Sequence, residues 1–392
     1  MRFLRSFKPK KDLSFFIWLF ITLYLLFALI SITINLIFLS LAFLCLLVQY
    51  FQKRQKPAFP GFFWPLVAYA ILTLFSSIFS INPEVSLKDS RELLLFLIVP
   101  MVYTGFSYEK DLKKANLALM ISAYINILYS ILYYLFRAAP EERITGFMGH
   151  YMTQAGLLCL FCSMALCLFL FSREKSRYLW GTGFILALAP LFLSLTRSAW
   201  LGLFVAVTLI LALSKPKALI IMPIALGFFL LISPQNIKKR AFDILRLKDV
   251  TNIHRIEYLK AGIQITRDYP LFGTGPDMVD KVFQDPKYGL SELAKNNVHL
   301  HNNVTQIAAE RGIPALLTWL AFMVWSFLSL LKLLKQKDSS LYPFTLAALG
   351  ALSILASSGL FEYNFADSEI TTLFLYMITV PFTLAHLKNT KS

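Results

Sequence analysis

The feature that most constrains this chain is a succession of apolar runs, separated by short polar segments. Many of these runs are about 20 residues long, which is the length that a helix needs to cross the hydrocarbon core of a membrane. Of the 392 residues, 57% are hydrophobic and only 15% are charged. A soluble protein of this size needs more polar residues to cover its surface. The pattern therefore predicts an all-α polytopic membrane protein.

Basic residues set the expected topology, because Lys and Arg mark cytoplasmic loops. Five short segments between apolar runs are rich in them: QKRQK, YEKDLKK, SREKSR, KPK and KQKD. With these segments inside, the chain has about twelve transmembrane helices and both termini in the cytoplasm. The loops also account for the net charge of +16, so we expect no nucleic-acid partner. We expect residence in a bacterial inner membrane.

A long polar segment divides the chain. Residues 1–233 are expected to form transmembrane helices 1–9, and residues 313–392 helices 10–12. Residues 234–312 between them predict a large, partly helical periplasmic loop that carries the catalytic region, because long loops are exported largely regardless of their charge. The four cysteines lie inside apolar runs, which indicates buried thiols rather than disulfides.

Ionisable residues at the outer membrane face are candidates for function. Arg197 interrupts LSLTRSAWLGL between two apolar runs, which favours a bound anion over a turn arginine that reaches toward lipid headgroups. Arg143, in RITGFMGHYMTQAG, either contacts the same anion or pairs with Glu141 or Glu142. Both arginines lie at predicted outer ends of helices.

The long loop holds two further candidates. HRIEYLKAGIQITRD, residues 254–268, predicts an amphipathic helix with Arg255, Tyr258 and Lys260 at or near its polar face, although a solvated basic face is the alternative. HLHNN, residues 299–303, follows. A histidine there suits a general base, because its ordinary pKa lies nearest neutrality. A metal site lacks an obvious third ligand, and a hydrogen-bonded structural histidine remains open.

The first outer turn, Ser31 to Asn35, has no carboxylate that could hold a metal beside a diphosphate. If a diphosphate leaves in a site of this chain, arginines must neutralise it instead, since their planar guanidinium groups bind phosphate in bidentate fashion. We expect no metal and no cofactor.

Several motifs occur in a fixed order: RITGFMGH, TRSAWLGL, Arg255, LFGTGP after Pro270, HLHNN through ERG, and GLFEYNFADSE. Together with the predicted topology they resemble the O-antigen ligase / O-antigen polymerase superfamily. The resemblance implies a GT-C-like, all-helical glycosyltransferase and a glycan donor linked to undecaprenyl diphosphate. It implies phosphate-binding roles for Arg197 and Arg255 and a catalytic role for His301. After Asn302 the chain departs from the family pattern, which leaves the acceptor preference open.

The resulting hypothesis is an O-antigen ligase that works by metal-independent, inverting transfer. His301 is the base, and Arg197, Arg255 and Arg143 bind the diphosphate. Supporting roles are expected for three residues: His299, Asn302 and Tyr258. The acceptor is the lipid A core or, in a polymerase, a second lipid-linked glycan. Membrane lipids surround the protein, and a lipid or polysaccharide transporter is an alternative of another class. Whether Glu362, Asp367 or Glu369 joins the site is left open.

Overall fold

The chain was analysed as a computed structural model, which describes residues 13–53, 58–137, 139, 142–242, 250–336, 338 and 340–389. Within these ranges the regular structure is helical, with no strand. The α-helices are α1 Leu13–Phe27, α2 Ile32–Lys53, α3 Phe63–Ile78, α4 Pro83–Asp89, α5 Ile98–Gly105, α6 Glu109–Phe136, α7 Tyr151–Phe171, α8 Arg177–Leu193, α9 Arg197–Ser214, α10 Ile221–Ile232, α11 Gln235–Phe242, α12 Val250–Asp268, α13 Val279–Val282, α14 Glu292–Lys295, α15 Asn303–Lys335, α16 Tyr342–Ser358 and α17 Ser368–Asn389. The 3₁₀ helices are η1 Ser90–Leu97, η2 Gly146–Met148, η3 Pro216–Ile220 and η5 Pro286–Tyr288.

Six described helices are long and apolar enough to cross a membrane, namely α2, α6, α7, α9, α15 and α17. Four shorter apolar helices accompany them: α1, α3, α8 and α16. The prediction of an all-α polytopic membrane protein is thus confirmed. The count of about twelve spans stays a prediction. The span expected between INPEVSLKDSRE and YEKDLKK is divided into η1 and the eight-residue α5. The ninth expected span consists of η3 and the twelve-residue α10.

The segment INPEVSLKDSRE is helical over most of its length, although we expected a loop. Asn82 caps α4, because its Oδ1 accepts a hydrogen bond from the Val85 amide at 3.4 Å. Pro83 follows as the first helical residue, where a missing N–H costs nothing. The local start signals of a helix are therefore complete, and the charges of this segment lie on a short helix.

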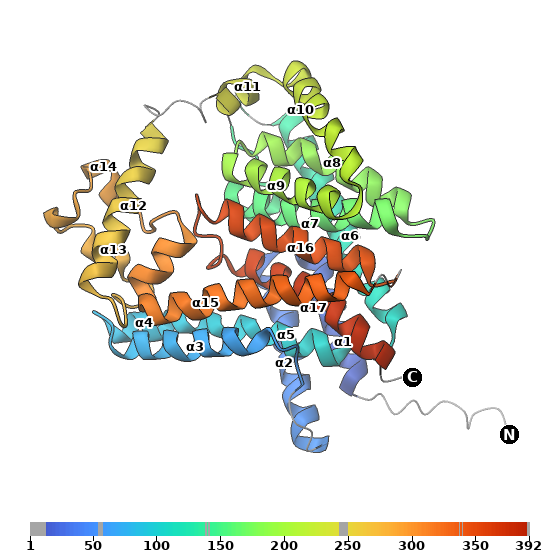
Figure 1. Cartoon of the computed structure of the whole chain (residues 1–392), viewed down its shortest axis with the longest axis horizontal. Helices are drawn as coiled ribbons and strands as arrows, with labels where there is room; N and C mark the ends of the chain where they lie inside the picture. Colours follow the sequence, from blue (N-terminus) through green and yellow to red (C-terminus); the bar gives the residue numbers. More distant parts are fainter. Residues whose placement is uncertain are drawn as a thin grey trace.

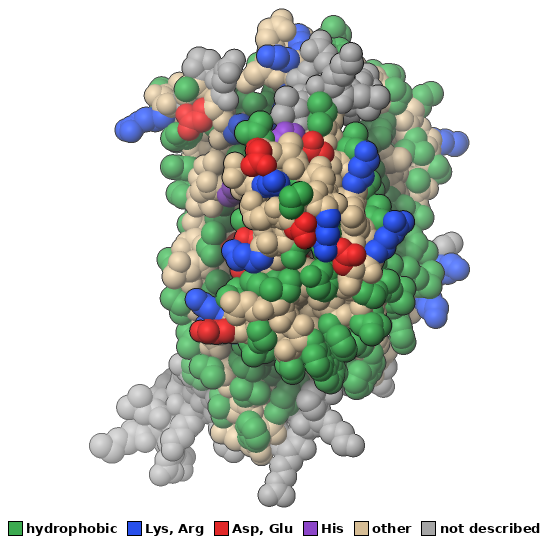
Figure 2. Space-filling model, turned by 90° about the vertical axis from the view of Figure 1, so that its left-hand side faces the viewer, with side chains coloured by type: hydrophobic (Ala, Val, Ile, Leu, Met, Phe, Trp, Pro, Cys, Tyr) green, Lys and Arg blue, Asp and Glu red, His purple; other side chains and the backbone are tan. Residues whose placement is uncertain are grey.

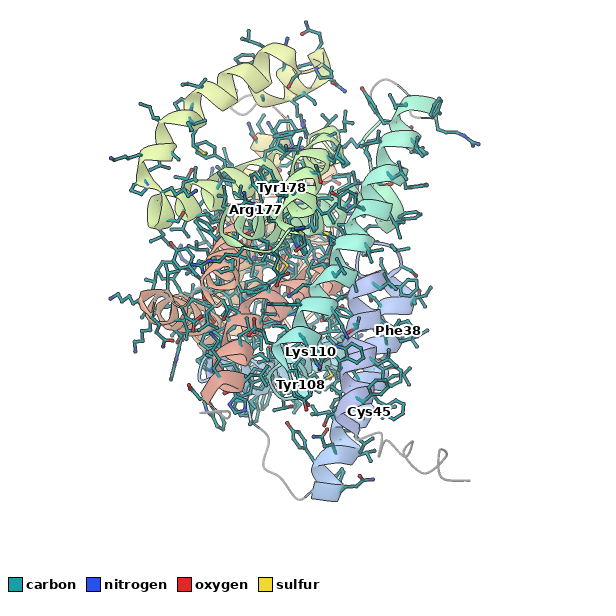
Figure 3. All side chains as sticks on the ribbon, turned by 90° about the vertical axis from the view of Figure 1, so that its right-hand side faces the viewer. Phe38, Cys45, Tyr108, Lys110, Arg177 and Tyr178 are labelled. Atoms are coloured by element: carbon teal, nitrogen blue, oxygen red, sulfur yellow. The ribbon has the colours of Figure 1, made fainter. Side chains whose placement is uncertain are left out.

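The helices pack in layers around α7, α16 and α17, whose side chains are largely buried (Figure 1). The pairs with the most extensive contacts include α1 with α2, α9 with α16, α7 with α8, and α3 with α15. Figure 3 shows the face that carries α2 and α6, where Phe38 and Cys45 project from α2. Of the four free cysteines, Cys45 is half-buried and the other three are buried, close to expectation.

Helices α12, α13 and α14 of the long polar segment form a small layer at the left end of the molecule in Figure 1, whereas α11 lies beside α10. Its helices α12, α13 and α14 pack with the start of α15 around a separate apolar cluster that includes Tyr258, Ile265, Phe283 and Leu300. The turn that follows α12 fixes this layer to α15, since the Thr274 and Gly275 amides each donate at 2.9 Å to the carbonyls of Ala309 and Glu310.

A kink in α15 joins this layer to the membrane helices. Gly312 has φ +80° and ψ 169°, so the helix is interrupted there. A Cβ at this position would lie 2.1 Å from the Leu271 carbonyl oxygen, which only glycine tolerates. The helical stretch that ends at Glu310 and the span expected over 313–335 are therefore two arms of one element, and the first arm begins beside His301.

Candidate functional site

Arg197 lies at the first residue of α9 and is 6% exposed. The tight turn before it contains Leu195 with φ +54°, a backbone conformation that is rare for a bulky side chain. The Arg197 guanidinium donates from Nη2 to Asn252 Oδ1 of α12 at 3.3 Å. The apolar helix α9 and helix α12 thus meet at this arginine.

Arg143 holds the turn that presents Arg197. Its Nε donates to the Ser194 carbonyl at 2.9 Å, and its Nη2 donates to the Leu195 carbonyl at 3.1 Å and to Thr196 Oγ1 at 3.2 Å. The guanidinium also stacks 3.3 Å from the centre of the Tyr151 ring. Burial, the largest cause, lowers the pKa of Arg143 to about 10, which leaves it charged at neutral pH. Much of its donor capacity serves the turn.

Arg255 projects from α12 toward the turn between α16 and α17, with its guanidinium 5.4 Å from the centre of the Phe361 ring. His301 lies just before α15 and has φ +51°. Such backbone conformations are uncommon outside glycine and concentrate at functional sites. Two of the three non-glycine residues with positive φ in the described chain, Leu195 and His301, therefore belong to this region.

The His301 imidazole is oriented by a side chain that the sequence interpretation missed. Asn297 Oδ1 accepts from the Val298 amide at 2.9 Å, so its Nδ2 faces His301 Nε2 at 2.5 Å and Tyr258 Oη at 3.3 Å. The Tyr258 hydroxyl donates to the Ala294 carbonyl at 3.1 Å, which leaves its oxygen as an acceptor for Asn297. This chain of donors assigns the lone pair to Nε2 of His301 and its proton to Nδ1.

The environment of His301 also keeps its imidazole neutral. Burial, followed by the charges of Arg255, His299 and His150, lowers the pKa of His301 to about 4. A neutral imidazole with an available lone pair is the form that accepts a proton. His301 is therefore in the basic form at all pH values near neutrality.

These side chains surround two adjoining cavities. The polar cavity has a volume of about 350 Å³ and is lined by Arg143, Tyr151, Met152, Leu195, Thr196, Arg197, Ser198, Arg240, His254, Arg255, Tyr258, Asn297, His301 and Glu362. The apolar groove has about 360 Å³ and is lined by Arg197, Ser198, Leu201, Asn252, Arg255, Ile256, Leu259, Leu300, His301, Asn302, Leu360 and Phe361. The two share Arg197, Ser198, Arg255 and His301.

The polar cavity is strongly positive. Four arginines line it, against the one acidic side chain of Glu362. Glu362 is 5% exposed and accepts a hydrogen bond from Ser198 Oγ at 2.5 Å. Burial is the largest cause that raises the pKa of Glu362, to about 7, so part of its negative charge is lost at neutral pH. An anion in this cavity meets guanidinium groups and little repulsion.

The remaining sequence candidates separate into two groups. Asn302 lines the groove and caps α15, because its Oδ1 accepts from the Thr305 amide at 3.0 Å. His299 lines neither cavity; its ring packs edge-on against Tyr363, and burial lowers its pKa. Asp367 accepts from Thr153 Oγ1 at 2.5 Å and caps α17, and Glu369 accepts from Ser368 Oγ at 2.9 Å. Both acids lie outside the two cavities.

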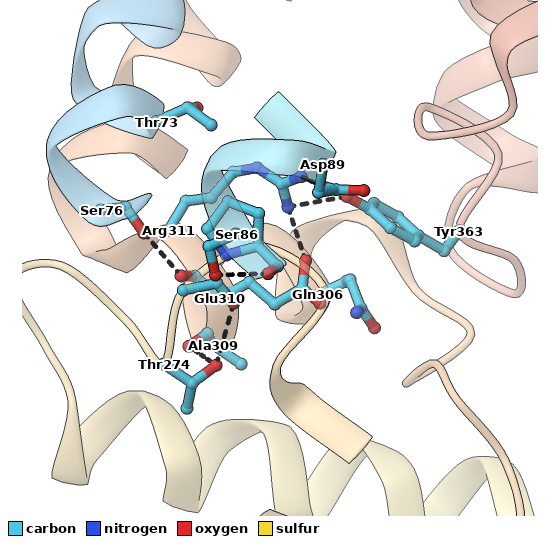
Figure 4. A network of polar contacts seen from close by, with 12 residues as sticks. Thr73, Ser76, Ser86, Asp89, Thr274, Gln306, Ala309, Glu310, Arg311 and Tyr363 are labelled. Atoms are coloured by element: carbon cyan, nitrogen blue, oxygen red, sulfur yellow. Dashed lines mark hydrogen bonds and ion pairs between the residues drawn. The ribbon is translucent and has the colours of Figure 1, made fainter. Parts of the chain in front are cut away.

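A buried polar network supports the turn that carries Glu362 (Figure 4). Arg311 Nη1 donates to Glu310 Oε2 at 2.6 Å and to Tyr363 Oη at 2.8 Å, and Nη2 lies 3.7 Å from Asp89 Oδ2. Ser76 Oγ donates to the Glu310 carbonyl at 2.9 Å. The network links α3, α4 and α15 to the residue next to Glu362, which fixes one wall of the polar cavity.

The end of the molecule formed by α12–α14 carries charged side chains of both signs above a broad hydrophobic zone (Figure 2).

Among the described residues, no group of three His, Cys, Asp or Glu side chains has an arrangement that could hold a metal ion. Four lining residues were not predicted from the sequence: Ser198, Arg240, His254 and Asn297. Ser198 and His254 lie inside the quoted motifs and Asn297 lies two residues before HLHNN, whereas Arg240 lies in no motif.

Comparison with known proteins bears on this site. None of the curated proteins matches the chain significantly. Residues 182–320 match the model of the O-antigen ligase family. The matched region contains Arg197, Arg255 and His301, and it ends inside the second arm of α15. The part of the chain that carries the three candidate site residues is therefore similar to the O-antigen ligase family.

Proposed function

We propose that this protein is an O-antigen ligase, which transfers a glycan from undecaprenyl diphosphate to the lipid A core oligosaccharide on the periplasmic face of the inner membrane. The observation that carries the proposal is that Arg197, Arg255 and His301, which lie far apart in the sequence, line the same two cavities. A group that binds anions and a neutral base are thereby held at one place.

The shapes and linings of the cavities suit the two ends of such a donor. Leu201, Ile256 and Leu259 give the groove an apolar wall between α9 and α12, where a prenyl chain leaves water. Arg197 and Arg255 stand at the boundary between the groove and the polar cavity. A diphosphate bound there has its lipid on one side and its sugar on the other.

The proposed reaction is a single displacement with inversion. The acceptor hydroxyl oxygen attacks the anomeric carbon while the bond from that carbon to the diphosphate oxygen breaks. The leaving diphosphate takes the bonding electron pair, and the hydroxyl proton passes to Nε2 of His301. The arginines stabilise the charge that grows on the diphosphate, which does not require a metal. The hydroxyl replaces Asn297 as the hydrogen-bond donor to Nε2 when the acceptor binds.

Arg143 takes a positioning role in this scheme. Its hydrogen bonds to the Ser194 and Leu195 carbonyls hold the turn that aims Arg197 into the cavity. Its charge adds to the positive potential felt by the diphosphate. In the same scheme Glu362 accepts the hydrogen bond of Ser198 and lines the polar cavity together with His301.

The test uses the purified full chain, a labelled lipid-diphosphate glycan and lipid A core as acceptor. We expect His301→Ala to lower the rate of transfer by ~10²–10⁴-fold, the usual contribution of a general base. His386→Ala is the matched control, because His386 lies near the C-terminal end of α17 and packs against Tyr103 rather than in either cavity. Full transfer by His301→Ala contradicts the proposal.

The acceptor is tested separately. The same donor is offered with lipid A core in one reaction and with a second lipid-linked glycan in another. Transfer to lipid A core alone supports a ligase, whereas chain growth on the lipid-linked glycan alone identifies a polymerase of the same superfamily. Loss of either product in His301→Ala ties that reaction to this site.

A further inference from the structure

A separate cavity, away from the polar cavity and the apolar groove, lies among α6, α7, α8 and α16 and has a volume of about 340 Å³. We call it the distal cavity. Its polar side is formed by residues from three segments that the sequence marks as cytoplasmic loops, among them Lys113, Lys114 and Arg173. Its apolar side is formed by Leu117, Leu168, Trp180, Pro343 and Phe344. One wall is thus polar and basic, and the other is suited to hydrocarbon.

The distal cavity lies at the opposite end of α7 from the site described above. Tyr151 and Met152, at the first turn of α7, line the polar cavity, whereas Leu168 and Ser172, at its other end, line the distal cavity. At a rise of 1.5 Å per residue these ends are about 25 Å apart. This separation approaches the thickness of the hydrocarbon core, so the two cavities belong to opposite membrane surfaces.

A buried amide in the distal cavity has an unmet hydrogen-bonding need. Asn116 is 2% exposed and lines the cavity. Its Oδ1 accepts from the Tyr376 hydroxyl at 2.7 Å, but its Nδ2 finds no partner among the described residues. A buried donor without an acceptor is costly. The amide therefore calls for an oxygen acceptor supplied by something that enters the cavity.

The charges of the cavity specify the kind of acceptor. Lys113 is paired with Glu109 at 3.1 Å and with Glu174 at 2.8 Å, so these three side chains together carry one net negative charge. Lys114 and Arg173 add two positive charges to the lining, whose net charge is therefore positive by one. With Asn116 as an additional donor, the polar wall suits a phosphate oxygen, and the apolar wall suits an acyl chain.

We propose that the distal cavity binds one anionic phospholipid. Its phosphate contacts Lys114 and Arg173, a headgroup or ester oxygen accepts from Asn116 Nδ2, and an acyl chain lies along Trp180 and Phe344. Basic pockets between transmembrane helices at the cytoplasmic surface are suited to such headgroups. The proposal rests on this cavity alone and is independent of the transferase activity.

Native mass spectrometry of the detergent-purified full chain tests the proposal. Phosphatidylglycerol and phosphatidylcholine with identical acyl chains are titrated in parallel, and inorganic phosphate is added in a third series. We expect one tightly retained phosphatidylglycerol per chain and weaker retention of phosphatidylcholine. Each basic side chain is expected to raise the affinity for an anionic headgroup about fivefold. The double variant Lys114→Gln with Arg173→Gln is therefore expected to weaken phosphatidylglycerol binding about 30-fold.

The control variant removes two positive charges from the same basic segments, outside the distal cavity. Lys110 and Arg177, labelled in Figure 3, do not line the distal cavity, and Lys110→Gln with Arg177→Gln is expected to leave binding unchanged. Asn116→Asp retains an acceptor for Tyr376 but loses the amide donor and adds a negative charge, so it too is expected to weaken binding. Melting temperatures confirm that each variant is folded.

Three outcomes overturn the proposal. Equal retention of the two lipids shows that charge does not select the occupant. An unchanged preference in the Lys114 and Arg173 double variant places the lipid elsewhere. Saturation by inorganic phosphate, without a gain from acyl chains, identifies the occupant as a free anion instead of a lipid.

Discussion

At the scale of single residues, the environment of His301 decides the pH dependence of the proposed reaction. The protonated imidazole cannot accept a proton, so activity is lost as pH falls through the pKa of His301. That pKa is lowered from 6.5 to about 4, chiefly by burial and by Arg255. We therefore expect transfer at limiting substrate to persist well below pH 6, with its acid limb near the lowered pKa.

Asn297→Asp tests how that pKa is held down. A carboxylate at 2.5 Å from Nε2 stabilises the imidazolium, whereas the amide donor opposes it. We expect the acid limb of kcat/KM to move upward by about one to two pH units, since an adjacent opposite charge typically has an effect of that size. The measurement is a pH–rate profile of the purified enzyme.

Asn296→Asp is the control for this change, because the exposed side chain of Asn296 adds the same charge one residue away and outside both cavities. It is expected to leave the acid limb in place. An acid limb that stays fixed in Asn297→Asp as well shows that Asn297 does not set the protonation of His301.

Residues also mark the limits of what could be predicted. Arg197, Arg255 and His301 were proposed from their type, their position at predicted helix ends and a family resemblance, and they line the same two cavities. Asn297 and Asn116 could not be found that way, because an asparagine in a polar loop or an apolar helix is unremarkable until its neighbours are known. Arg143 was assigned to an anion because its use of the Ser194 and Leu195 carbonyls depends on the fold.

At the scale of elements, the kink of α15 determines where the site lies. Gly312 allows the first arm to leave the direction of the membrane helix, and that arm begins at the residues beside His301. The sequence separated the two arms correctly at about this point. It could not show that they are one element, because the interruption is a single residue with helical segments on both sides.

Gly312→Ala is expected to be strongly destabilising. A side chain at positive φ costs about 1–2 kcal/mol. Here the Cβ also meets the Leu271 carbonyl oxygen at 2.1 Å. We expect a large drop in the melting temperature of the purified protein, with loss of transfer.

Gly289→Ala separates the two causes. Gly289 has φ +64°, but a Cβ there meets no atom within 4 Å, so this variant carries the backbone cost alone. We expect it to shift the melting temperature only slightly. Equal shifts for the two variants mean that the contact with Leu271 is relieved without cost.

The region between α3 and α5 shows why element boundaries were less predictable than the fold class. Charged residues at 84–92 suggested a loop after a span. The structure instead forms α4 and η1, whose Asp89 faces Arg311 and whose Ser86 donates to the Pro276 carbonyl at 2.7 Å. The charges are accommodated by tertiary partners about 190 to 220 residues away in the sequence, and such partners leave no local pattern.

At the scale of the whole molecule, the two ends of the bundle differ in chemistry. One end holds the polar cavity and helices α12–α14, and the other holds the distal cavity and the basic segments. The alternation of apolar runs and basic segments predicts which end faces the cytoplasm, and this orientation stays a prediction. Helix count was less secure, because α5 and α10 are too short to be identified as spans by length.

Accessibility of single cysteines tests the orientation. Lys281→Cys introduces a thiol at an exposed position of α13, and Lys110→Cys introduces one at an exposed position of α6. In intact cells of a Cys45→Ser background, a membrane-impermeant thiol reagent is expected to label only the first. The second is expected to react after the inner membrane is permeabilised. Labelling in the reverse order contradicts a periplasmic site.

The contacts of Arg143 join two motifs that are about 50 residues apart into one mechanical part. RITGFMGH supplies the guanidinium, and the chain just before TRSAWLGL supplies the carbonyls that receive it. A chimera that exchanges only one of these segments for its counterpart from a relative separates the Arg143 guanidinium from the carbonyls to which it donates. Engineering of this protein therefore has to transplant both segments together, because the hydrogen bonds between them hold the turn before Arg197.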